Sequence, residues 1–202
     1  RLTGSYNQSG QSTNILSAVG TFPSLFARVY DEWGQDYTNT YRISAQWEHN
    51  APIGFVDRLS FLAYFNSVYT QADTYTLRGA TASVVPSNAR ASQFYYTQNV
   101  AGGELQMHTD RNIGGLDNFF TYGLSFSWTT TTRPRNRTQI TLATGATTNN
   151  VGGETYPNKN FPDTDTVQAG IYVQDEISAL GGRLKITPAV RLDYYSMTPN
   201  PD

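Results

Sequence analysis

The chain has 202 residues, a formal net charge of −2 and no cysteine. This length suits one domain with a sizeable core, and the absence of like-charge blocks excludes a basic surface for nucleic acid. Without cysteine there is no disulfide framework and no thiolate metal site. No apolar run approaches the ~18 residues of a transmembrane helix. Because Arg1 is not followed by a signal-peptide pattern, we expect a mature, trimmed or internal segment.

Aromatic residues make up 13% of the chain, including 14 tyrosines and 3 tryptophans, whereas the mean hydropathy is negative. A soluble protein so rich in aromatic residues usually carries more aliphatic core. A membrane β-barrel combines the two features, because its strands alternate lipid-facing apolar residues with polar residues that face the lumen.

Apolar and polar residues alternate with a period of two over several segments, which predicts β-strands rather than helices. Residues 1–6 are expected to be the tail of a strand whose start is missing. Residues 40–48 form the next strand. Its apolar positions are Tyr41, Ile43, Ala45 and Trp47, and the polar positions between them are Arg42, Ser44, Gln46 and Glu48.

The segments 57–79 and 91–109 alternate less regularly and are longer than the ~9–11 residues that cross a membrane. We expect both to project beyond the bilayer. Three later segments alternate more regularly. They are 117–129, with Phe120, Tyr122, Leu124, Phe126 and Trp128 on one face, 166–178, with Val167, Ala169, Ile171, Val173 and Ile177, and the segment from Arg183, with Leu184, Ile186, Val190 and Leu192. The total is about seven strands.

The predicted connections alternate in length along the chain. The long ones are 7–37, 80–90 and 134–163, and the short ones are 50–56, 110–116 and 179–182. A soluble sandwich has no reason to place every long connection at one end. Outer-membrane barrels do so, with short periplasmic turns and longer extracellular loops. The sequence therefore predicts an all-β fold, an antiparallel up-and-down segment of a transmembrane β-barrel.

Few residues suggest catalysis or metal binding. His49 and His108 are the only histidines, and both fall close to short turns, so we interpret them as solvated turn residues. No serine, histidine and carboxylate set points to a hydrolase. Asp175 and Glu176 lie on opposite faces of a strand, so they cannot act as a carboxylate pair. We therefore do not expect an enzyme.

Two groups of residues are candidates for contacts outside the cell. They are the basic group Arg133, Arg135 and Arg137 and the aromatic pair Tyr30 and Trp33. The arginines open the third long connection, where they could attract an anionic ligand or lipopolysaccharide phosphates. A positive rim that keeps the loop soluble is the alternative. The aromatic pair, in the first long connection, could stack on a ligand or pack the loop against the barrel rim.

Several motifs resemble TonB-dependent outer-membrane receptors. They are Phe161-Pro162-Asp163-Thr164-Asp165-Thr166, Gly170-Ile171-Tyr172-Val173-Gln174-Asp175-Glu176-Ile177 and Leu184-Lys185-Ile186-Thr187-Pro188-Ala189-Val190-Arg191-Leu192-Asp193-Tyr194-Tyr195. Two others are similar to the haem and haemoglobin receptor branch of that family, Tyr122-Gly123-Leu124-Ser125-Phe126-Ser127 and Arg42-Ile43-Ser44 with Trp47. Siderophore receptors share the Tyr172 to Glu176 motif, which identifies the superfamily better than the cargo.

The resemblance covers nearly the whole chain and implies a barrel of about 22 strands, plugged by an N-terminal domain and energised through TonB. Residues 1–202 are then part of the barrel domain, without the plug and the remaining strands. The haem ligands of the family lie elsewhere, so neither His49 nor His108 takes that role. The polar strand face is expected to contact the plug or lumen water. It includes Arg42, Gln46, Thr121, Ser125, Gln168, Gln174, Lys185 and Arg191.

The leading hypothesis is a fragment of a bacterial outer-membrane receptor that imports haem or a haem-protein iron source. A ferric siderophore is the alternative cargo, and a soluble all-β binding module is the alternative from another class. The expected partners are outer-membrane lipid, lipopolysaccharide, the TonB complex and the cargo, but not nucleic acid. We expect no resident cofactor, because haem or an iron chelate would be the transported ligand.

Overall fold

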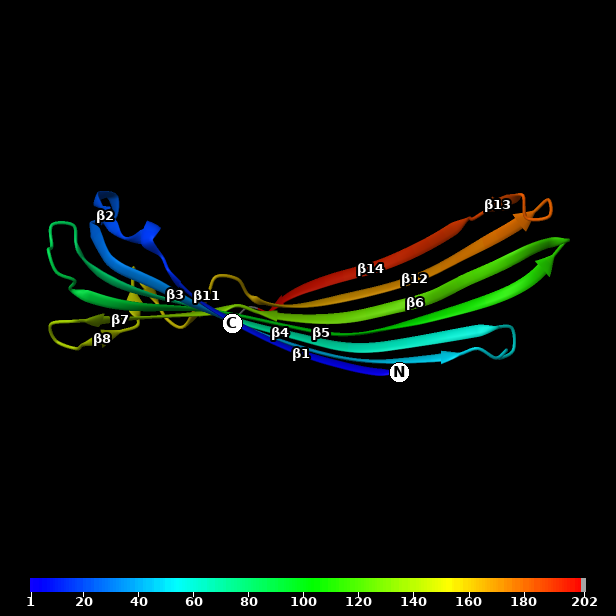
Figure 1. Ribbon diagram of the computed structural model, residues 1–202, viewed down its shortest axis with the longest axis horizontal. Helices are drawn as coiled ribbons and strands as arrows, with labels where there is room; N and C mark the ends of the chain where they lie inside the picture. Colours follow the sequence, from blue (N-terminus) through cyan, green and yellow to red (C-terminus); the bar gives the residue numbers. More distant parts are fainter. Residues whose placement is uncertain (201–202) are drawn as a thin grey trace.

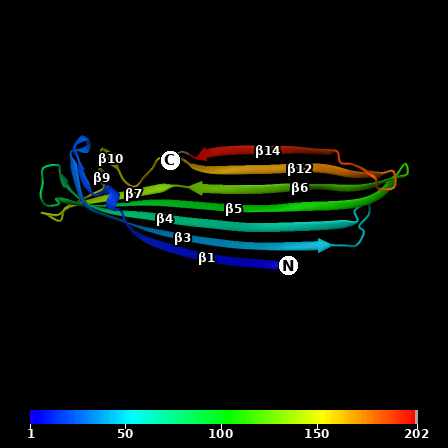
Figure 2. The same cartoon turned by 45° about the horizontal axis from the view of Figure 1, so that its top comes forward.

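The computed structural model describes residues 1–200, most of which belong to one antiparallel β-sheet. Seven long strands lie side by side in chain order (Figure 2). They are β1 (Leu2–Asn14), β3 (Ala27–His49), β4 (Arg58–Ala80), β5 (Asn88–Ile113), β6 (Leu116–Thr132), β12 (Asp163–Ala179) and β14 (Ala189–Asn200). Every neighbouring pair is antiparallel, which confirms the predicted all-β, up-and-down fold.

Shorter elements occupy the connections. They are η1 (Leu16–Ala18), β2 (Gly20–Phe22), η2 (Pro23–Leu25), β7 (Pro134–Thr141), β8 (Thr147–Thr148), β9 (Asn150–Val151), β10 (Glu154–Thr155), β11 (Asn158–Lys159) and β13 (Leu184–Ile186). The elements η1 and η2 are single 3₁₀ turns. Within residues 1–200, no helix has the length and apolar content needed to cross a membrane.

The sheet is an open, twisted arc (Figure 1). The edge strand β1 pairs with β3, and the other edge strand β14 pairs with β12. Neither has a second long partner within residues 1–200. Open edges expose backbone N–H and C=O groups that lipid cannot satisfy. An arc of this kind therefore needs further strands to function in a membrane, and closure into a barrel of about 22 strands stays a prediction.

The two ends of the sheet differ in the length of their connections. The short-turn end carries the connections 50–57, 114–115 and 180–183, at the right in Figure 1, and the long-connection end carries 15–26, 81–87 and 133–162, at the left. This asymmetry confirms the predicted alternation of long and short connections. Two of the short turns use glycine pairs with positive φ, Gly114-Gly115 and Gly181-Gly182, because other residues rarely adopt that conformation.

The prediction of a loop over 7–37 is wrong for most of its length. The strand β1 continues to Asn14, where it pairs with Trp33, and β3 already starts at Ala27. Both sheet faces carry polar residues in this region, so the apolar alternation stops while the strands continue. Backbone pairing, which satisfies every N–H and C=O group, extends the strands beyond the apolar part of the sheet.

The prediction of a loop over 134–163 is wrong in its first part. The strand β7 pairs with the first part of β5, from Asn88 opposite Thr141 to Phe94 opposite Arg135. The remainder of β5 pairs with β6. The two strands β4 and β5 contain 23 and 26 residues. At ~3.4 Å per residue they extend about 80–90 Å, far more than the ~25 Å apolar band needs, a length that agrees with the prediction that both project beyond the bilayer.

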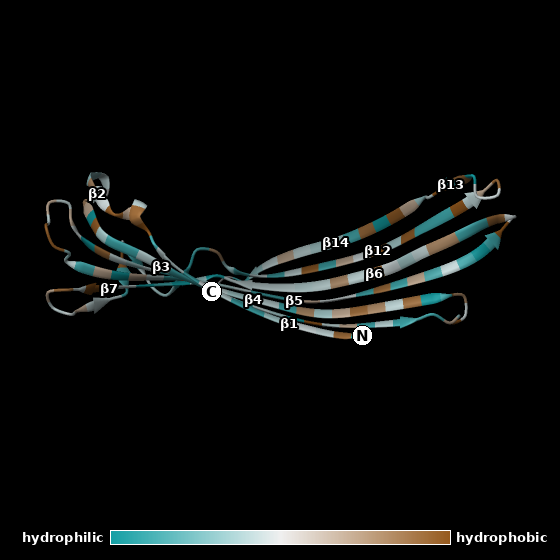
Figure 3. Ribbon diagram, viewed as in Figure 1, coloured by the Kyte–Doolittle hydropathy of each residue, from teal (hydrophilic) through white to brown (hydrophobic). Residues whose placement is uncertain are grey.

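One face of the sheet, here called the outer face, carries a continuous apolar row. Cross-strand pairing joins Trp47, Phe61, Leu105, Leu124, Ile171 and Leu192 on six neighbouring strands. In the isolated chain Leu124 is 47% exposed and Leu192 is 68% exposed. Figure 3 shows hydrophobic and hydrophilic residues alternating along these strands. A surface of this kind is stable where lipid, rather than water, covers it.

The opposite, inner face is polar. Strand alternation and register place the eight predicted polar residues on it, Arg42, Gln46, Thr121, Ser125, Gln168, Gln174, Lys185 and Arg191, as expected. Glycines on this face allow large side chains to lie across the sheet. A Cβ atom on Gly102 would lie 2.5 Å from the hydroxyl of Tyr64, and one on Gly170 would lie 2.7 Å from Asp193 Oδ1.

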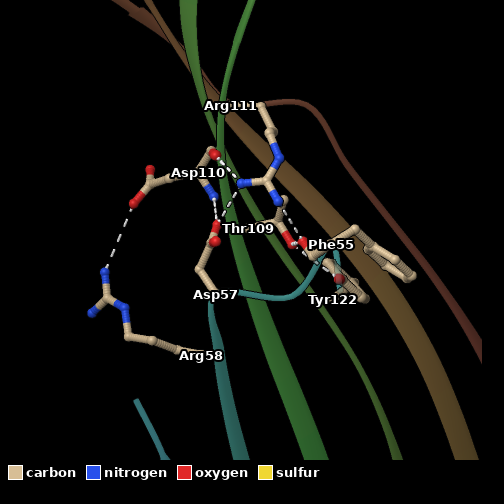
Figure 4. A network of polar contacts seen from close by, with 7 residues as sticks. All are labelled: Phe55, Asp57, Arg58, Thr109, Asp110, Arg111 and Tyr122. Carbon is tan, nitrogen blue, oxygen red and sulfur yellow. Dashed lines mark hydrogen bonds and ion pairs between the residues drawn. The ribbon is translucent and has the colours of Figure 1, made fainter. Parts of the chain in front are cut away.

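A network of polar contacts ties the β3–β4 connection to β5 at the short-turn end (Figure 4). Asp57 Oδ2 accepts hydrogen bonds from the backbone N–H of Asp110 (2.7 Å) and from Arg111 Nη1 (2.8 Å). Arg111 Nη2 and Thr109 Oγ1 both donate to the carbonyl oxygen of Phe55, at 2.9 and 2.8 Å. The N–H of Asp110, followed by Arg111, holds the pKa of Asp57 below its ordinary value of 3.8.

The apolar row generates the first prediction. Leu124→Arg is expected to impair membrane assembly, because an arginine at the midplane of the lipid face costs about 2–4 kcal/mol. The measurement is the fraction of heat-modifiable, membrane-inserted protein after expression of the complete reading frame. Gln168→Arg is the matched control, since it adds the same charge to the inner face of the neighbouring strand. Equal insertion of both variants would contradict the assignment of the two faces.

The Asp57 network generates the second prediction. A lowered carboxyl pKa means that ionised Asp57 stabilises the fold above the ordinary pKa, and that this contribution is lost as the pH falls through the lowered value. A nitroxide label attached at Ala51→Cys should therefore gain mobility as the pH falls through this lowered pKa, below the ordinary value of 3.8. In Asp57→Asn the label should already be as mobile at pH 7 as it is at low pH in the protein that has Asp57. Asp117→Asn is the control, and a pH step that survives in Asp57→Asn would refute the role of this carboxylate.

Candidate functional site

The structure places the five residues predicted to make external contacts at the long-connection end. Arg133 directly follows β6, whereas Arg135 and Arg137 lie on β7. Tyr30 and Trp33 lie on β3, so the prediction that they belong to a loop is wrong. The strand extends through them because β3 pairs with β4 as far as Ala27, with one irregularity in register beside Tyr30.

The sheet separates the aromatic pair from the basic group. Trp33 lies opposite Tyr75 on the outer face, and their rings stack with centroids 4.1 Å apart. The Tyr30 hydroxyl donates to the carbonyl oxygen of Ser83 at 2.7 Å, in the β4–β5 connection. Both contacts pack a connection and neighbouring strands at the rim. The structure therefore supports the packing interpretation of Tyr30 and Trp33, and the five residues do not form one surface.

The basic group is organised around a buried tyrosine. Tyr156 is 1% exposed, and the guanidinium groups of Arg135 and Arg137 lie 5.3 and 5.2 Å from its ring centroid. Arg135 also pairs with Glu154 at 2.9 Å. The Tyr156 hydroxyl and Arg135 lower the pKa of Glu154, and the same hydrogen bond raises the pKa of Tyr156. These contacts fix β10 and the following segment against β7.

Arg133 has a separate neighbour. Its guanidinium group lies 5.3 Å from the ring centroid of Tyr96, on β5. Arg133 itself is exposed. Of the three predicted arginines, Arg133 and Arg135 are thus engaged by neighbours within the rim, whereas Arg137 also reaches a cavity on the inner face.

That cavity, here called the inner rim pocket, has a volume of about 450 Å³. The strands β3, β4, β5 and β7 form its floor, and η1 and β2 contribute to its wall. It is lined by Ser17, Ala18, Phe22, Val29, Glu32, Thr74, Thr76, Arg78, Arg90, Ser92, Phe94 and Arg137. Its volume lies within the ~300–1,000 Å³ range of small-molecule sites.

Cross-strand register explains why the pocket belongs to the inner face. Glu32, Thr76, Arg90 and Gln139 lie opposite one another on four neighbouring strands. On β5, Arg90 is an even number of residues from Gly102, so both side-chain positions point to the same face. The first long connection folds over this face through Ala18 and Phe22. The pocket therefore opens toward the expected lumen, at the end that carries the long connections.

Neither histidine lies in a turn, which corrects the sequence interpretation. His49 is the last residue of β3 and stacks on Trp47, with ring centroids 5.7 Å apart. His108 lies on β5, where its Nδ1 is 3.1 Å from Thr121 Oγ1. Residues 1–200 contain no group of three or more histidine, cysteine or acidic residues that could hold a metal ion.

The fold and the rim together agree with a comparison to known protein families. The family model "TonB dependent receptor-like, beta-barrel" matches residues 1–202, and the chain belongs to this family. Members are outer-membrane proteins of Gram-negative bacteria and act as transporters rather than enzymes. A search of curated proteins found no match to the chain.

The end assignment generates the third prediction. The chain has no cysteine, so single cysteines can be introduced and labelled cleanly. Thr148→Cys, in the third long connection, should react with a membrane-impermeant maleimide on intact cells, because outer-membrane barrels expose their long loops. Arg183→Cys, in a short turn, should react only after the cells are opened. The reverse result would show that the long connections face the periplasm.

Proposed function

We propose that this chain forms part of the wall of an outer-membrane receptor that imports haem or a haem-protein iron source with energy coupled through TonB. The observation that carries the proposal is the continuous apolar row on the outer face. A polar inner face lies opposite this row, and the inner rim pocket lies on that inner face at the long-connection end. Membership of the TonB-dependent receptor family supports import as the activity.

In this proposal the cargo enters at the long-connection end and passes along the polar inner face. Residues such as Gln168 and Arg191 would contact a plug domain or lumen water. The TonB complex would act from the periplasm through that plug, and the outer face would contact lipid and lipopolysaccharide. Haem is the cargo in this scheme, so the chain needs no resident cofactor.

A ferric siderophore is the second candidate cargo. The motif from Tyr172 to Glu176 lies within β12 and supports the superfamily without distinguishing the two cargoes. A soluble all-β binding module has no comparable support. Its surface would have to expose Leu124, Ile171 and Leu192 to water on neighbouring strands.

The fourth prediction tests the cargo and the energy coupling. A strain without the gene should lose growth on haemin as sole iron source, and the complete reading frame should restore it only when TonB is present. Growth rate under iron limitation is the measurement, with ferric siderophores as the parallel arm. Restoration only on a siderophore would replace haem by the alternative cargo. Restoration without TonB would overturn the coupling.

A further inference from the structure

Three arginines form a diagonal across the inner rim pocket. Arg78 lies on β4, Arg90 on β5 and Arg137 on β7. Arg90 pairs directly with Thr76 and Gln139, and the other two arginines lie two residues from these partners in opposite directions. Such diagonal neighbours in a sheet lie about 7–8 Å apart. Backbone register therefore sets the positions of the three arginines along one line.

The protein neutralises only part of the positive charge on this line. Glu32 is the only acidic residue that lines the pocket, and it accepts a hydrogen bond from Thr76 Oγ1 at 3.1 Å. Within residues 1–200, no acidic side chain pairs with Arg78, Arg90 or Arg137. The lining thus carries three positive charges and one negative charge.

Arg90 lies at the centre of the line, and it is the arginine that a bound anion would stabilise most. Burial, together with Arg78 and Arg137, lowers its pKa to about 10. Its Nε atom is buried without a hydrogen-bond partner in the described part of the chain. Like charges held this close repel one another, and burial weakens the solvation that would screen them. A bound anion would remove both costs.

Two of the three guanidinium groups, those of Arg90 and Arg137, are held by contacts within the protein. Arg90 Nη2 donates to Gln139 Oε1 at 2.8 Å, and Arg137 Nε donates to Ser92 Oγ at 3.0 Å. Arg137 also lies over the ring of Tyr156. These contacts leave other guanidinium donors available. Arginine forks that are already oriented suit the two oxygens of a carboxylate.

The rest of the pocket lining combines hydroxyl-bearing side chains with an apolar part. Ala18, Phe22, Val29 and Phe94 form the apolar part. A small inorganic ion would leave this surface in contact with water. A ligand with a carboxylate on an apolar framework would contact both parts of the lining. Its carboxylate would accept charge-assisted hydrogen bonds from the arginines, and its framework would bury apolar area against the apolar residues.

We propose that the inner rim pocket binds a carboxylate-bearing apolar ligand, with Arg90 as its central anion contact and Arg78 and Arg137 beside it. The inference deepens the proposed import function and rests on it, since it names the chemical class of cargo that the mouth accepts. It moves the ligand-binding role from Arg133 and Arg135, which contact Tyr96, Glu154 and Tyr156, to the arginines that line the inner rim pocket. Lipopolysaccharide, which surrounds the outer face, is not the ligand of this pocket.

The fifth prediction uses protoporphyrin IX, a flat apolar ring with two carboxylates, and its uncharged dimethyl ester. The receptor from the complete reading frame, purified in detergent, should bind the acid, and Arg90→Gln should weaken binding about ten- to a hundredfold, as expected for loss of a charged hydrogen-bond donor. The dimethyl ester should bind weakly to both proteins. Fluorescence titration is the measurement.

Arg28→Gln is the matched control. It removes one arginine at the same end of the sheet, where Arg28 Nη1 donates to the carbonyl oxygen of Ser83 at 3.3 Å, and it should leave the affinity within about twofold. Arg90→Lys keeps the charge without the guanidinium fork and should bind with intermediate affinity. Heat-modifiable electrophoretic mobility shows whether each variant is folded.

Three results would overturn the pocket proposal. They are acid binding by folded Arg90→Gln at wild-type affinity, equal affinity of the wild type for acid and ester, and no binding of the acid to the wild type. Each is distinguishable from failure of the import function. If only the pocket proposal fails, TonB-dependent growth on haemin or a siderophore should persist with Arg90→Gln. Loss of all TonB-dependent growth in the wild type would instead reject import itself.

Discussion

The antiparallel hydrogen-bond ladder is the constraint on which the rest of this structure depends. In lipid each backbone N–H and C=O must find a partner within the protein, and the strands between the two edges satisfy this requirement through one antiparallel ladder with a single register irregularity, beside Tyr30. A slip of one residue between two strands would turn every side chain to the other face. The apolar row from Trp47 to Leu192 and the polar inner face are therefore consequences of the same pairing.

The ladder continues where the apolar surface ends, and this continuation creates the rim. The strands β4 and β5 extend past the apolar row, and β7 replaces β6 as the partner of β5. The inner rim pocket lies on this extension. Its arginines are carried by strands rather than by loop tips, so the backbone ladder fixes the spacing of their Cα atoms. Sites carried by strands are held more precisely than sites carried by loops. Such rigidity would suit a pocket that binds the cargo before the cargo moves inward.

Sequence pattern predicts the part of this fold in which the two faces have different environments. The alternation around Trp47 and Leu124 identifies strands because one face is apolar and the other is polar. It does not identify residues 7–14, 27–37 or β7, where the regular alternation of apolar and polar residues stops while backbone pairing continues the strand. The same limit explains the pocket. Arg78 and Arg90 flank one connection in the sequence. Arg137 comes near them only because β7 pairs with β5, and it is 45 residues from its hydrogen-bond partner Ser92 in the sequence.

The basic group predicted from the sequence lies at the long-connection end of the sheet, where the inner rim pocket also lies. Arg135 forms an ion pair with Glu154 and lies over the ring of Tyr156. Because these contacts engage its guanidinium group within the rim, Arg135 is poorly placed to recognise a ligand. Arg137 lies two residues further along the same strand, and it faces Arg90 without an acidic partner. An arginine with an acidic partner stabilises the fold. An arginine held beside other arginines is repelled by them, and a bound anion would relieve that repulsion. If the pocket binds the cargo as proposed, the inner face of the wall, more than the loops above it, would select the charge of the cargo.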